Sequence, residues 1–521
     1  MIVILSLFRL ARAGLVFARE GVIGLVDPAM VPPPARFGLR LARLIERGDT
    51  RTRADKLTAA LTRLGPTYVK LGQFLATRPD VVGQSIAHDL EALQDRVPPF
   101  DQATAEAIIT ANLGGPIASF FTSLGPPIAA ASIAQVHRAS VEDETGTRTV
   151  AVKVLRPGIG DRFRSDLADY YVAARLAQRF VPDAARLRPV EVVDTLARSM
   201  AIELDLRLEA AAASEMAERT KDDLDFRVPT VDWIRTGRQV LTTQWIDGLP
   251  LSDRNAIEKA GHDPVALGRT VIQSFLRHAL RDGFFHADMH QGNLFIGPDG
   301  ELVAVDFGIM GRIGPKERRF LAEILLGFIT KSYRRVAEVH FEAGYVPSHH
   351  SIDEFAQAIR AIGEPIHSRK ADEISMAKLL SLLFEVTAIF DMKTRTELVL
   401  LQKTMVVVEG VARSLDPKLD MWGTAEPVVR EWITRHLGPV GRIEDVGEGA
   451  VTLGKLIGQV PALLDRAALL SGRIDDLTRD GFVLAPQSLA GIGEAEARRN
   501  RWSTVALWVI AVLLAANLLI R

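Results

Sequence analysis

His286-Ala-Asp-Met-His-Gln-Gly-Asn293, followed thirteen residues after its last member by Asp306-Phe-Gly308, is the stretch that decides the fold. Phosphoryl transfer from a nucleotide requires a carboxylate near the acceptor, oxygen ligands for Mg²⁺ and a lysine on the phosphates. Asp288 and Asn293 lie five residues apart, which is the spacing of a kinase catalytic loop, and Asp306 is the expected second metal ligand. The sequence therefore predicts a nucleotide-phosphate site that uses ATP and Mg²⁺, with Asp288 as its catalytic carboxylate.

The residues between these motifs explain why they meet. Leu294-Phe-Ile296 and Leu302-Val-Ala-Val305 are short apolar runs, separated by Gly297-Pro-Asp-Gly-Glu301. This pattern is typical of a β-hairpin, whose outer ends lie next to each other. We therefore expect Asn293 and Asp306 to lie side by side and to share one or two Mg²⁺ ions.

A second hairpin is predicted upstream. Val150-Ala-Val-Lys153 follows an earlier apolar run, Ile133-Ala-Gln-Val136, and a polar turn. A lysine on the second strand of such a hairpin matches the one that pairs with the α- and β-phosphates in kinases. Taken alone, Lys153 is better interpreted as a solvated lysine at a strand end, and only the downstream loop favours the phosphate role.

The segment before this hairpin departs from the kinase pattern. Kinases carry glycines there, because a backbone without Cβ atoms can approach phosphates closely. This chain has Ile128-Ala-Ala-Ala-Ser-Ile133 instead, with no glycine, so its nucleotide binding should differ from that of an ordinary protein kinase. The nucleotide contacts expected from this loop are Ala129, Ala130, Ala131, Ser132, Ile133 and Ala134.

A second departure follows Gly308. The residues from Ile309 to Pro315 lead almost at once into a helical pattern at 317–326, and no Ala-Pro-Glu sequence follows. Ala287 stands where protein kinases usually have an arginine that holds a phosphorylated loop. Docking of a peptide substrate and control by loop phosphorylation are therefore not expected.

Beyond the shared kinase core, four features of the chain resemble the UbiB family of atypical kinase-like proteins, which support ubiquinone biosynthesis. The resemblance covers about residues 30 to 420. It rests on Lys70-Leu-Gly72-Gln73, the alanine-rich loop, Glu203-Leu-Asp205 with Glu209 six residues after Glu203, and 403–410 running to Leu415-Asp-Pro417. This family is better described by ATPase activity tied to lipid or quinone-precursor binding than by protein phosphorylation.

The resemblance implies a role for each matching residue. Lys153 would form an ion pair with Glu209, and both would act in catalysis with Asp288, while Asn293 and Asp306 would bind Mg²⁺. A lid over the nucleotide, where a peptide would otherwise enter, would consist of Lys70, Gly72, Gln73, Glu203 and Asp205.

The residues alone leave two of these roles open. Glu209 lies 56 residues after Lys153, so extra helices must be inserted between them, and other acidic residues such as Glu191 fit the same helical periodicity. Lys70 lies on an expected helix at 61–75, where a solvated lysine is the ordinary interpretation.

Composition limits the remaining possibilities. The chain has 521 residues, with 63 basic and 64 acidic side chains, and no basic block argues for nucleic acid. It has no cysteine, which excludes disulfides and thiolate metal sites. The eleven histidines show no metal-ligand spacing. For His286 and His290, which flank Asp288, we expect a structural or loop-orienting role.

The C-terminal segment differs from soluble composition. Residues 502–520 are almost wholly apolar, and 19 residues at 1.5 Å each span roughly 28 Å, close to a bilayer core. Arg498, Arg499 and Arg501 precede this run while only Arg521 follows it, which predicts a single-pass helix with the body of the protein in the cytoplasm, at the bacterial inner membrane. The broken apolar run at 451–470 is expected to be an interfacial or packing helix. The apolar N-terminus is expected to be an amphipathic helix against the membrane.

The predicted fold class is α+β, a protein-kinase-like two-lobed fold with an N-terminal helical extension and a C-terminal transmembrane helix. Gln244-Trp-Ile-Asp-Gly-Leu-Pro250 is interpreted as the hinge, where backbone groups, including those of Gln244 and Ile246, would meet adenine. The predicted parts are a leading amphipathic segment at 1–34, a helical extension at 35–115, a small lobe at 116–250 with a helical insertion at about 161–222, a large lobe at 251–425, a helical region at 426–500 and a membrane anchor at 501–521.

Two other function classes stay open. One is a small-molecule phosphotransferase of the aminoglycoside type, and the other is a catalytically silent scaffold that binds nucleotide to assemble biosynthetic enzymes. The resemblance implies membrane lipids and prenylated quinone precursors as partners, with other quinone-biosynthesis enzymes as further candidates. The oligomeric state is left open.

Overall fold

The computed structural model describes residues 2–23, 45–46, 51–76, 78–91, 93, 98–144, 146–180, 187–367, 386, 389–392 and 396–437. Nearly all of these belong to one compact unit, Met1–Ile433. The predicted membrane anchor at 501–521 and the apolar run at 451–470 lie outside the described residues. Among the helices that are described, none combines the length and the apolar character needed to cross a membrane.

A four-stranded antiparallel sheet forms the small lobe, with strand order β1-β2-β3-β5. Its strands are β1 (Ser123–Ala130), β2 (Ala134–Asp143), β3 (Gly146–Leu155) and β5 (Val240–Gln244). The predicted hairpin before Lys153 is confirmed, because β2 and β3 pair along their whole length with Val136 opposite Lys153.

One face of this sheet is packed and the other faces the centre of the molecule. Val150, Val152 and Val154 are fully buried against α7 (Gln102–Leu113), together with Phe121. Side chains alternate between the two faces of a strand, so Lys153 lies on the opposite face from these valines.

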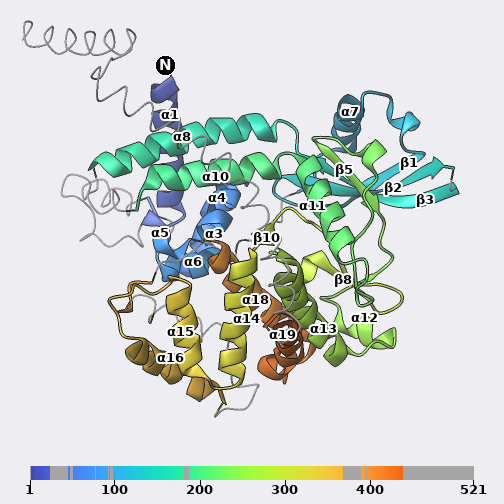
Figure 1. The fold of residues 1–521 in the computed structure, drawn as a ribbon. Helices are drawn as coiled ribbons and strands as arrows, with labels where there is room; N and C mark the ends of the chain where they lie inside the picture. The colour runs from blue at the N-terminus through green and yellow to red at the C-terminus, as the bar shows by residue number, and fades with distance from the viewer. Residues whose placement is uncertain are drawn as a thin grey trace, which may run out of the picture. The chain divides into compact units, whose positions relative to one another are not determined.

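Three helices follow β3, in the region of the predicted insertion. They are α8 (Ile159–Phe180), α10 (Pro189–Glu203) and α11 (Leu206–Arg219). Figure 1 shows α8 and α10 side by side, with α1 (Ile2–Arg19) beside α8. Arg9 on α1 donates to Asp169 on α8, with its Nε 2.6 Å from Oδ2, and the Asp169 side chain is only 1% exposed.

The predicted helical extension packs beneath α8 and α10. Its helices are α3 (Arg53–Leu64), α4 (Pro66–Ala76), α5 (Pro79–Val82) and α6 (Gln84–Glu91). Their apolar side chains share one buried cluster with Phe163, Leu196 and Leu206. Because this cluster also contains Leu155 and Leu241 from the sheet, it joins the extension to the face of the sheet that carries Lys153.

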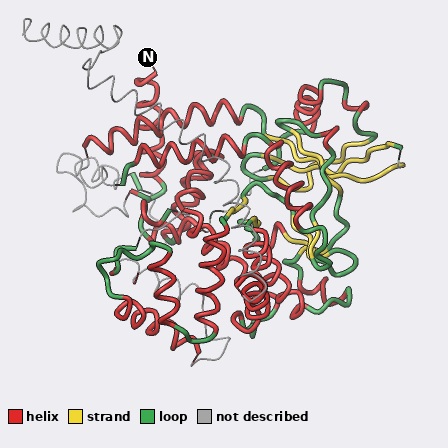
Figure 2. The backbone as a smooth tube through the Cα atoms, in the orientation of Figure 1, coloured by secondary structure: helices red, strands yellow, loops and turns green. Residues whose placement is uncertain are grey.

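The remaining strands form two small sheets. In one, β8 (Leu294–Ile296) and β9 (Leu302–Ala304) form the predicted hairpin, in a sheet with strand order β4-β9-β8-β6. Its outer strands are β4 (Phe226–Arg227) and β6 (Leu249–Pro250). In the other, β7 (Phe284–His286) pairs with β10 (Met310–Arg312). Figure 2 shows the strands gathered toward one side, with helices making up most of the rest.

The large lobe is mainly helical. Its helices are α12 (Arg254–Lys259), α13 (Pro264–Arg277), α14 (Pro315–Ile329), α15 (Tyr333–Glu342), α16 (Ile352–His367), α18 (Thr396–Leu415) and α19 (Met421–Leu437). A five-residue π-helical turn, His278–Asp282, follows α13. Short 3₁₀ turns lie at Ile117–Ser119, Trp233–Arg235 and Gln291–Asn293. The mixture of small sheets and packed helices agrees with the predicted α+β class.

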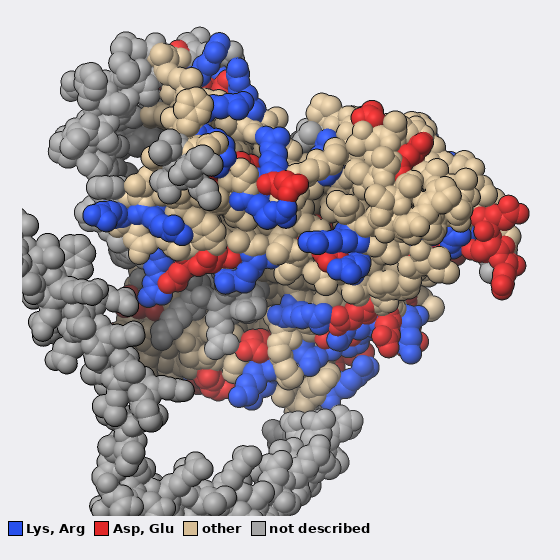
Figure 3. All heavy atoms as spheres, turned by 90° about the horizontal axis from the view of Figure 1, so that it is seen from above, with Lys and Arg blue, Asp and Glu red and all other residues tan. Residues whose placement is uncertain are grey.

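Charge is unevenly distributed over the face that includes α8. Figure 3, which views the molecule from above, shows Lys and Arg side chains spread across the middle of this face and an acidic tip at its right edge. Three acidic residues also lie in sequence where β2 ends, since Glu142 and Asp143 close the strand and Glu144 follows it.

Candidate active site

Lys153 lies between two carboxylates from distant parts of the chain. Its Nζ donates to Glu209 at 2.7 Å from Oε1 and 2.9 Å from Oε2, and lies 3.1 Å from Asp306 Oδ2. Lys153 is on β3, Glu209 is in the first turn of α11, and Asp306 follows β9. The ion pair between Lys153 and Glu209 that the resemblance implied is therefore present, 56 residues apart in sequence.

Burial and charge act in opposite directions on these three groups. Burial alone would lower the pKa of Lys153, but the carboxylates of Asp306 and Glu209 raise it above its usual value. Burial raises the pKa of Glu209 to about 7, although Lys153 opposes this effect. The surrounding protein partly desolvates Asp306, which would raise its pKa, yet Lys153 holds that pKa well below the usual range. Lys153 and Asp306 are therefore charged at neutral pH, while Glu209 titrates there.

The catalytic-loop residues are held by His286. The backbone N–H of Asp288 donates to His286 Nδ1 at 3.1 Å, so this nitrogen carries no proton. The other ring nitrogen, Nε2, then donates to the carbonyl oxygen of Val305 at 3.2 Å. Burial lowers the pKa of His286, consistent with a neutral ring. The His286 ring thus joins the Asp288 loop to the residue before Asp306, as a loop-orienting role requires.

His290 occupies a different position. Its Nε2 lies 3.7 Å from Asp288 Oδ2, and its side chain is 52% exposed. His290 Nδ1 accepts from the backbone N–H of Gly292 at 3.0 Å, which caps the turn Gln291–Asn293. The Asp288 carboxylate is 36% exposed, so solvent reaches it.

Asn293 and Asp306 meet as the hairpin predicts. The backbone N–H of Val305 donates to the carbonyl oxygen of Asn293 at 2.9 Å, next to Asp306. Asn293 Nδ2 donates to the carbonyl oxygen of Asp288 at 3.0 Å, which leaves its amide oxygen as an acceptor for a cation. The Asp306 side chain is 46% exposed. A carboxylate and an amide oxygen suit Mg²⁺, which prefers hard oxygen ligands, so the donor set fits the predicted cation.

The residues predicted to form the lid differ in their surroundings. Lys70 Nζ lies 2.8 Å from Glu203 Oε2, and both side chains are nearly buried. The positive charge of Lys70 also helps to lower the pKa of Asp306, after the larger effect of Lys153. Asp205 instead caps α11 by accepting from the backbone N–H of Arg207 and forms an ion pair with the same arginine at 2.6 Å.

The other two lid residues lie on α4. Gly72 is buried, and a Cβ atom there would lie 2.5 Å from Leu93 Cδ1 and 2.7 Å from Leu61 Cδ1. An alanine at this position would therefore force the two leucine side chains to move, so glycine suits the close packing of these helices. Gln73 is half-buried one residue further along the same helix.

The alanine-rich loop forms the turn between β1 and β2. The N–H of Ala131 donates to the carbonyl oxygen of Ala134 at 2.8 Å, and Arg156 Nε donates to the carbonyl oxygen of Ala131 at 3.0 Å. Ser132 is fully buried, and its hydroxyl has no hydrogen-bond partner among the residues that the structure describes. The exposure of the other loop residues decreases along the chain. Ala129 is exposed, Ala130 and Ala131 are half-buried, and Ile133 and Ala134 are buried.

The predicted hinge residues lie at and just after the end of β5. Gln244 pairs with Val150 and shares its face of the sheet, opposite to that of Lys153. The Gln244 side chain lines a surface cavity of about 550 Å³ together with Trp233 and Trp245. Its side chain therefore points away from the face that carries Lys153, and Ile246, which is half-buried, follows the end of β5.

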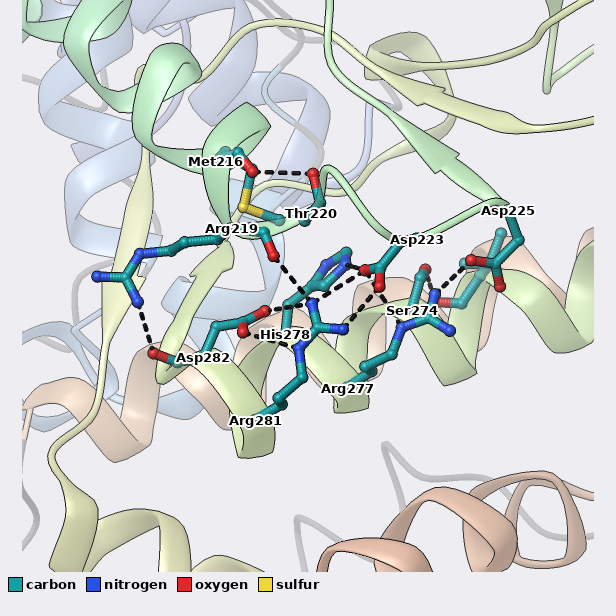
Figure 4. A network of polar contacts seen from close by, with 11 residues as sticks. Met216, Arg219, Thr220, Asp223, Asp225, Ser274, Arg277, His278, Arg281 and Asp282 are labelled. Atoms are coloured by element: carbon teal, nitrogen blue, oxygen red, sulfur yellow. Dashed lines mark hydrogen bonds and ion pairs between the residues drawn. The ribbon is translucent and has the colours of Figure 1, made fainter.

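A network of polar contacts, which sequence reasoning missed, fixes the far end of α11. Asp223 is 5% exposed and accepts from Arg281 Nη1 at 2.6 Å, while His278 Nε2 lies 3.1 Å from its Oδ2. Arg277 donates to Asp225 at 2.5 Å. Figure 4 shows these side chains linking the residues after α11 to α13 and the π-helical turn that follows it. The helix that carries Glu209 is thereby anchored to the large lobe.

Known proteins of one family match this chain over most of its length. Residues 92–340 match the ABC1 atypical kinase-like domain, and residues 359–420 match the UbiB helical domain. A protein of Marinobacter nauticus named "Probable protein kinase UbiB" is 38% identical over 468 residues, covering 88% of this chain and 85% of its own. One of the same name from Xanthomonas euvesicatoria pv. vesicatoria is 39% identical over 457 residues, covering 85% and 81%. A solved structure of an erythromycin complex from Mycobacterium tuberculosis is 25% identical, covers 70% of this chain and 96% of its own, and has a TM-score of 0.43.

Proposed function

This chain belongs to the UbiB family of atypical kinase-like proteins, and from this premise we propose that it is a membrane-anchored ATPase that supports ubiquinone biosynthesis. Its turnover would be coupled to the handling of hydrophobic, prenylated quinone precursors. The observation that carries the proposal is the position of Lys153, held by Glu209 and Asp306 beside the loop of Asp288 and Asn293.

The chain's own residues divide the work of phosphoryl transfer. Lys153 holds the phosphates, and Glu209 fixes the direction in which its ammonium group points. Asn293 and Asp306 would hold Mg²⁺, which neutralises charge that develops on the phosphate oxygens. Asp288 is solvent-accessible and accepts the proton of the attacking water.

Water is the proposed acceptor because the peptide-binding parts of a protein kinase are replaced. β10 leads to α14 at Pro315 without an extended substrate-binding segment. The helical extension contributes Lys70, which is paired with Glu203 and acts on Asp306 electrostatically. A chain of this design favours hydrolysis over transfer to a protein.

Membrane attachment is proposed at two places. The segment 501–521 would cross the bacterial inner membrane once, with the catalytic body in the cytoplasm. The helix α1 would lie against the same membrane, because Leu5, Phe8 and Leu15 are exposed on it, with Phe8 at 77%. Its opposite face is buried through Ala13 and packs toward α8. An exposed apolar face on an anchored helix is what interfacial binding requires.

The proposal is tested with the full-length protein in liposomes. ATP hydrolysis is measured with and without a phenolic prenyl analogue, for the wild type, Asp306→Asn, Lys153→Ala and the control Asp222→Asn, an exposed acid outside the site. We expect the first two variants to lose at least 100-fold in rate, the order of effect of removing a major transition-state contact, and the control to match the wild type.

Two results would contradict the proposal. Equal hydrolysis by the wild type and Asp306→Asn would show that the active-site assignment is wrong. Restoration of quinone content in a deletion strain by Asp306→Asn, to the wild-type level, would favour the nucleotide-binding scaffold over the ATPase.

A further inference from the structure

We propose that His349, His350 and Asp391 form a binding site for a divalent transition metal, with Zn²⁺ as the best-fitting ion. His349 and His350 lie in the loop between α15 and α16, and Asp391 lies in a turn 41 residues after His350. None of the three belongs to the elements that carry Lys153, Asp288 or Asp306. The site is therefore independent of the nucleotide site and of the proposed ATPase.

The positions of the three ligand atoms fit one metal ion. Asp391 Oδ2 lies 3.4 Å from His350 Nε2 and 3.9 Å from His349 Nε2. The ligand atoms of the three residues all lie within 4.8 Å of one another. A tetrahedral Zn²⁺ with bonds of about 2.0–2.1 Å places its ligand atoms roughly 3.3–3.4 Å apart, so small side-chain rotations would complete the geometry. Two imidazoles and one carboxylate leave a fourth position open to water or to an external ligand.

Hydrogen bonding does not explain why the side chains of His349, His350 and Asp391 lie so close together. His350 Nε2 is buried and has no hydrogen-bond partner in the part of the chain that the structure describes, although Asp391 Oδ2 is 3.4 Å away. A buried polar atom without a partner costs roughly 1–3 kcal/mol, and a cation placed between the two atoms would remove that cost. His350 Nε2 is thus available as a ligand atom, 3.4 Å from the carboxylate oxygen of Asp391.

The two segments are held in place by a shared aromatic cluster. The ring of His350 lies 5.3 Å from that of Phe390, which precedes Asp391, and Phe390 lies 5.0 Å from Phe355 on α16. Phe355 is fully buried and Phe390 is 7% exposed. Packing of this kind restricts the rotation of the His350 ring and holds the turn that carries Asp391 next to it.

A plain ion pair explains the cluster less well. Pairing of Asp391 with both imidazoles at once would require two cationic rings 4.1 Å apart, whose like charges would repel. An exposed pair between His349 and Asp391, with side chains 66% and 71% exposed, would also contribute little on its own. One divalent cation replaces the two protons and satisfies all three groups.

A bound metal would join two parts of the large lobe. His350 precedes the stretch 359–420 that matches the UbiB helical domain, and Asp391 lies within it. Binding would therefore stabilise the contact between Asp391 in that matched stretch and the loop that follows α15, rather than alter the phosphate site.

The test uses the full-length protein in detergent, stripped with a chelator and titrated with ZnCl₂ against a chromophoric competitor. We expect one tight Zn²⁺ per wild-type chain and a rise in the unfolding temperature on binding. His350→Ala and Asp391→Asn should each weaken binding by more than about 100-fold, since loss of even an outer contact costs 10–100-fold. His436→Ala, which changes an exposed histidine on α19, is the matched control and should bind as the wild type does.

X-ray absorption at the zinc edge provides a second measurement that does not depend on stability. The wild type should show nitrogen and oxygen neighbours only, at about 2.0–2.1 Å, with the outer-shell signal of imidazole. Retention of one tight zinc in both His350→Ala and Asp391→Asn, or no tight zinc in the wild type, would overturn the proposal. Either outcome leaves the ATPase proposal untouched, because Asp306 and Lys153 are unchanged in these proteins.

Discussion

Arg312 joins the strand that follows Asp306 to the helix that carries Glu209. Its Nη1 donates to Glu215 Oε1 at 2.8 Å, and Glu215 lies six residues after Glu209 on α11. The guanidinium carbon of Arg312 also lies 4.2 Å from the centroid of the Phe284 ring. The two carboxylates that hold Lys153 are thus connected through a second contact, so movement of α11 would disturb the Asp306 segment as well.

Breaking this contact should lower activity more than stability. In Glu215→Gln we expect ATP hydrolysis to fall about tenfold, because α11 and the Asp306 segment would no longer be held together. The Arg312 side chain is 62% exposed, so the loss in free energy of unfolding should stay below about 1 kcal/mol. Steady-state kinetics and urea unfolding measure the two effects. An equal change in Glu218→Gln, on the same helix, would indicate that the effect is not specific to the Arg312 contact.

The stability of the protein should depend on pH through Glu209. Folding raises its pKa to about 7 through burial. Protonated Glu209 therefore adds its full contribution to the free energy of unfolding below the usual glutamic acid pKa. This contribution is lost as the pH rises through about 7. Between about pH 5 and pH 8, the wild type should lose up to roughly 3 kcal/mol relative to Glu209→Gln.

Urea unfolding of both proteins across this pH range measures the difference. Neither of the neighbouring charges changes in this window, because the pKa of Asp306 is held low and that of Lys153 is raised. A difference between the two proteins that stays constant from about pH 5 to pH 8 would show that Glu209 does not titrate there.

Loss of the Asp223 carboxylate should destabilise the junction between α11 and α13. In Asp223→Asn, Arg281 and His278 would lose their buried partner, at a cost of roughly 2–4 kcal/mol. Hydrogen exchange should increase first at the end of α11. The control is Asp225→Asn, because the Asp225 side chain is 40% exposed and its removal should cost under about 1 kcal/mol. Equal effects of the two substitutions would argue against the anchoring role of Asp223.

Gly72→Ala should destabilise the protein by about 1–3 kcal/mol, because the new methyl group would overlap Leu93 and Leu61. Gly410→Ala is a matched control, since Gly410 is also in a helix but has no atom within 4 Å of a Cβ position. That substitution should stabilise by about 0.5–1 kcal/mol through helix propensity. Thermal unfolding of the two variants should shift in opposite directions, and a shared direction would contradict the packing argument.

Local pattern was sufficient where neighbouring residues determine the structure. The hairpin between Asn293 and Asp306 and the one before Lys153 follow from apolar runs and turns, and both are present. The predicted position of Glu209 depended on the resemblance, because the turns of α8 and α10 that separate it from Lys153 offer several acidic residues with equal periodicity.

Contacts between distant residues could not be predicted from the sequence. The face on which Gln244 lies depends on its pairing with Val150, and a shift of one residue would reverse it. The histidines show no metal-ligand spacing along the chain, since the third ligand of the proposed zinc site, Asp391, is contributed by a separate turn. The Asp223 network likewise needs the ends of α11 and α13 to meet before any of its residues can be singled out.

Asp306 has a backbone φ of +61°, in the left-handed region that most residues avoid. Aspartate and asparagine tolerate this conformation, whereas longer or β-branched side chains do so at a cost of roughly 1–3 kcal/mol. Replacement by glutamate would therefore meet an obstacle before any question of chemistry arises. The left-handed backbone and the proposed role as an Mg²⁺ ligand thus both favour a short side chain with an oxygen atom at this position.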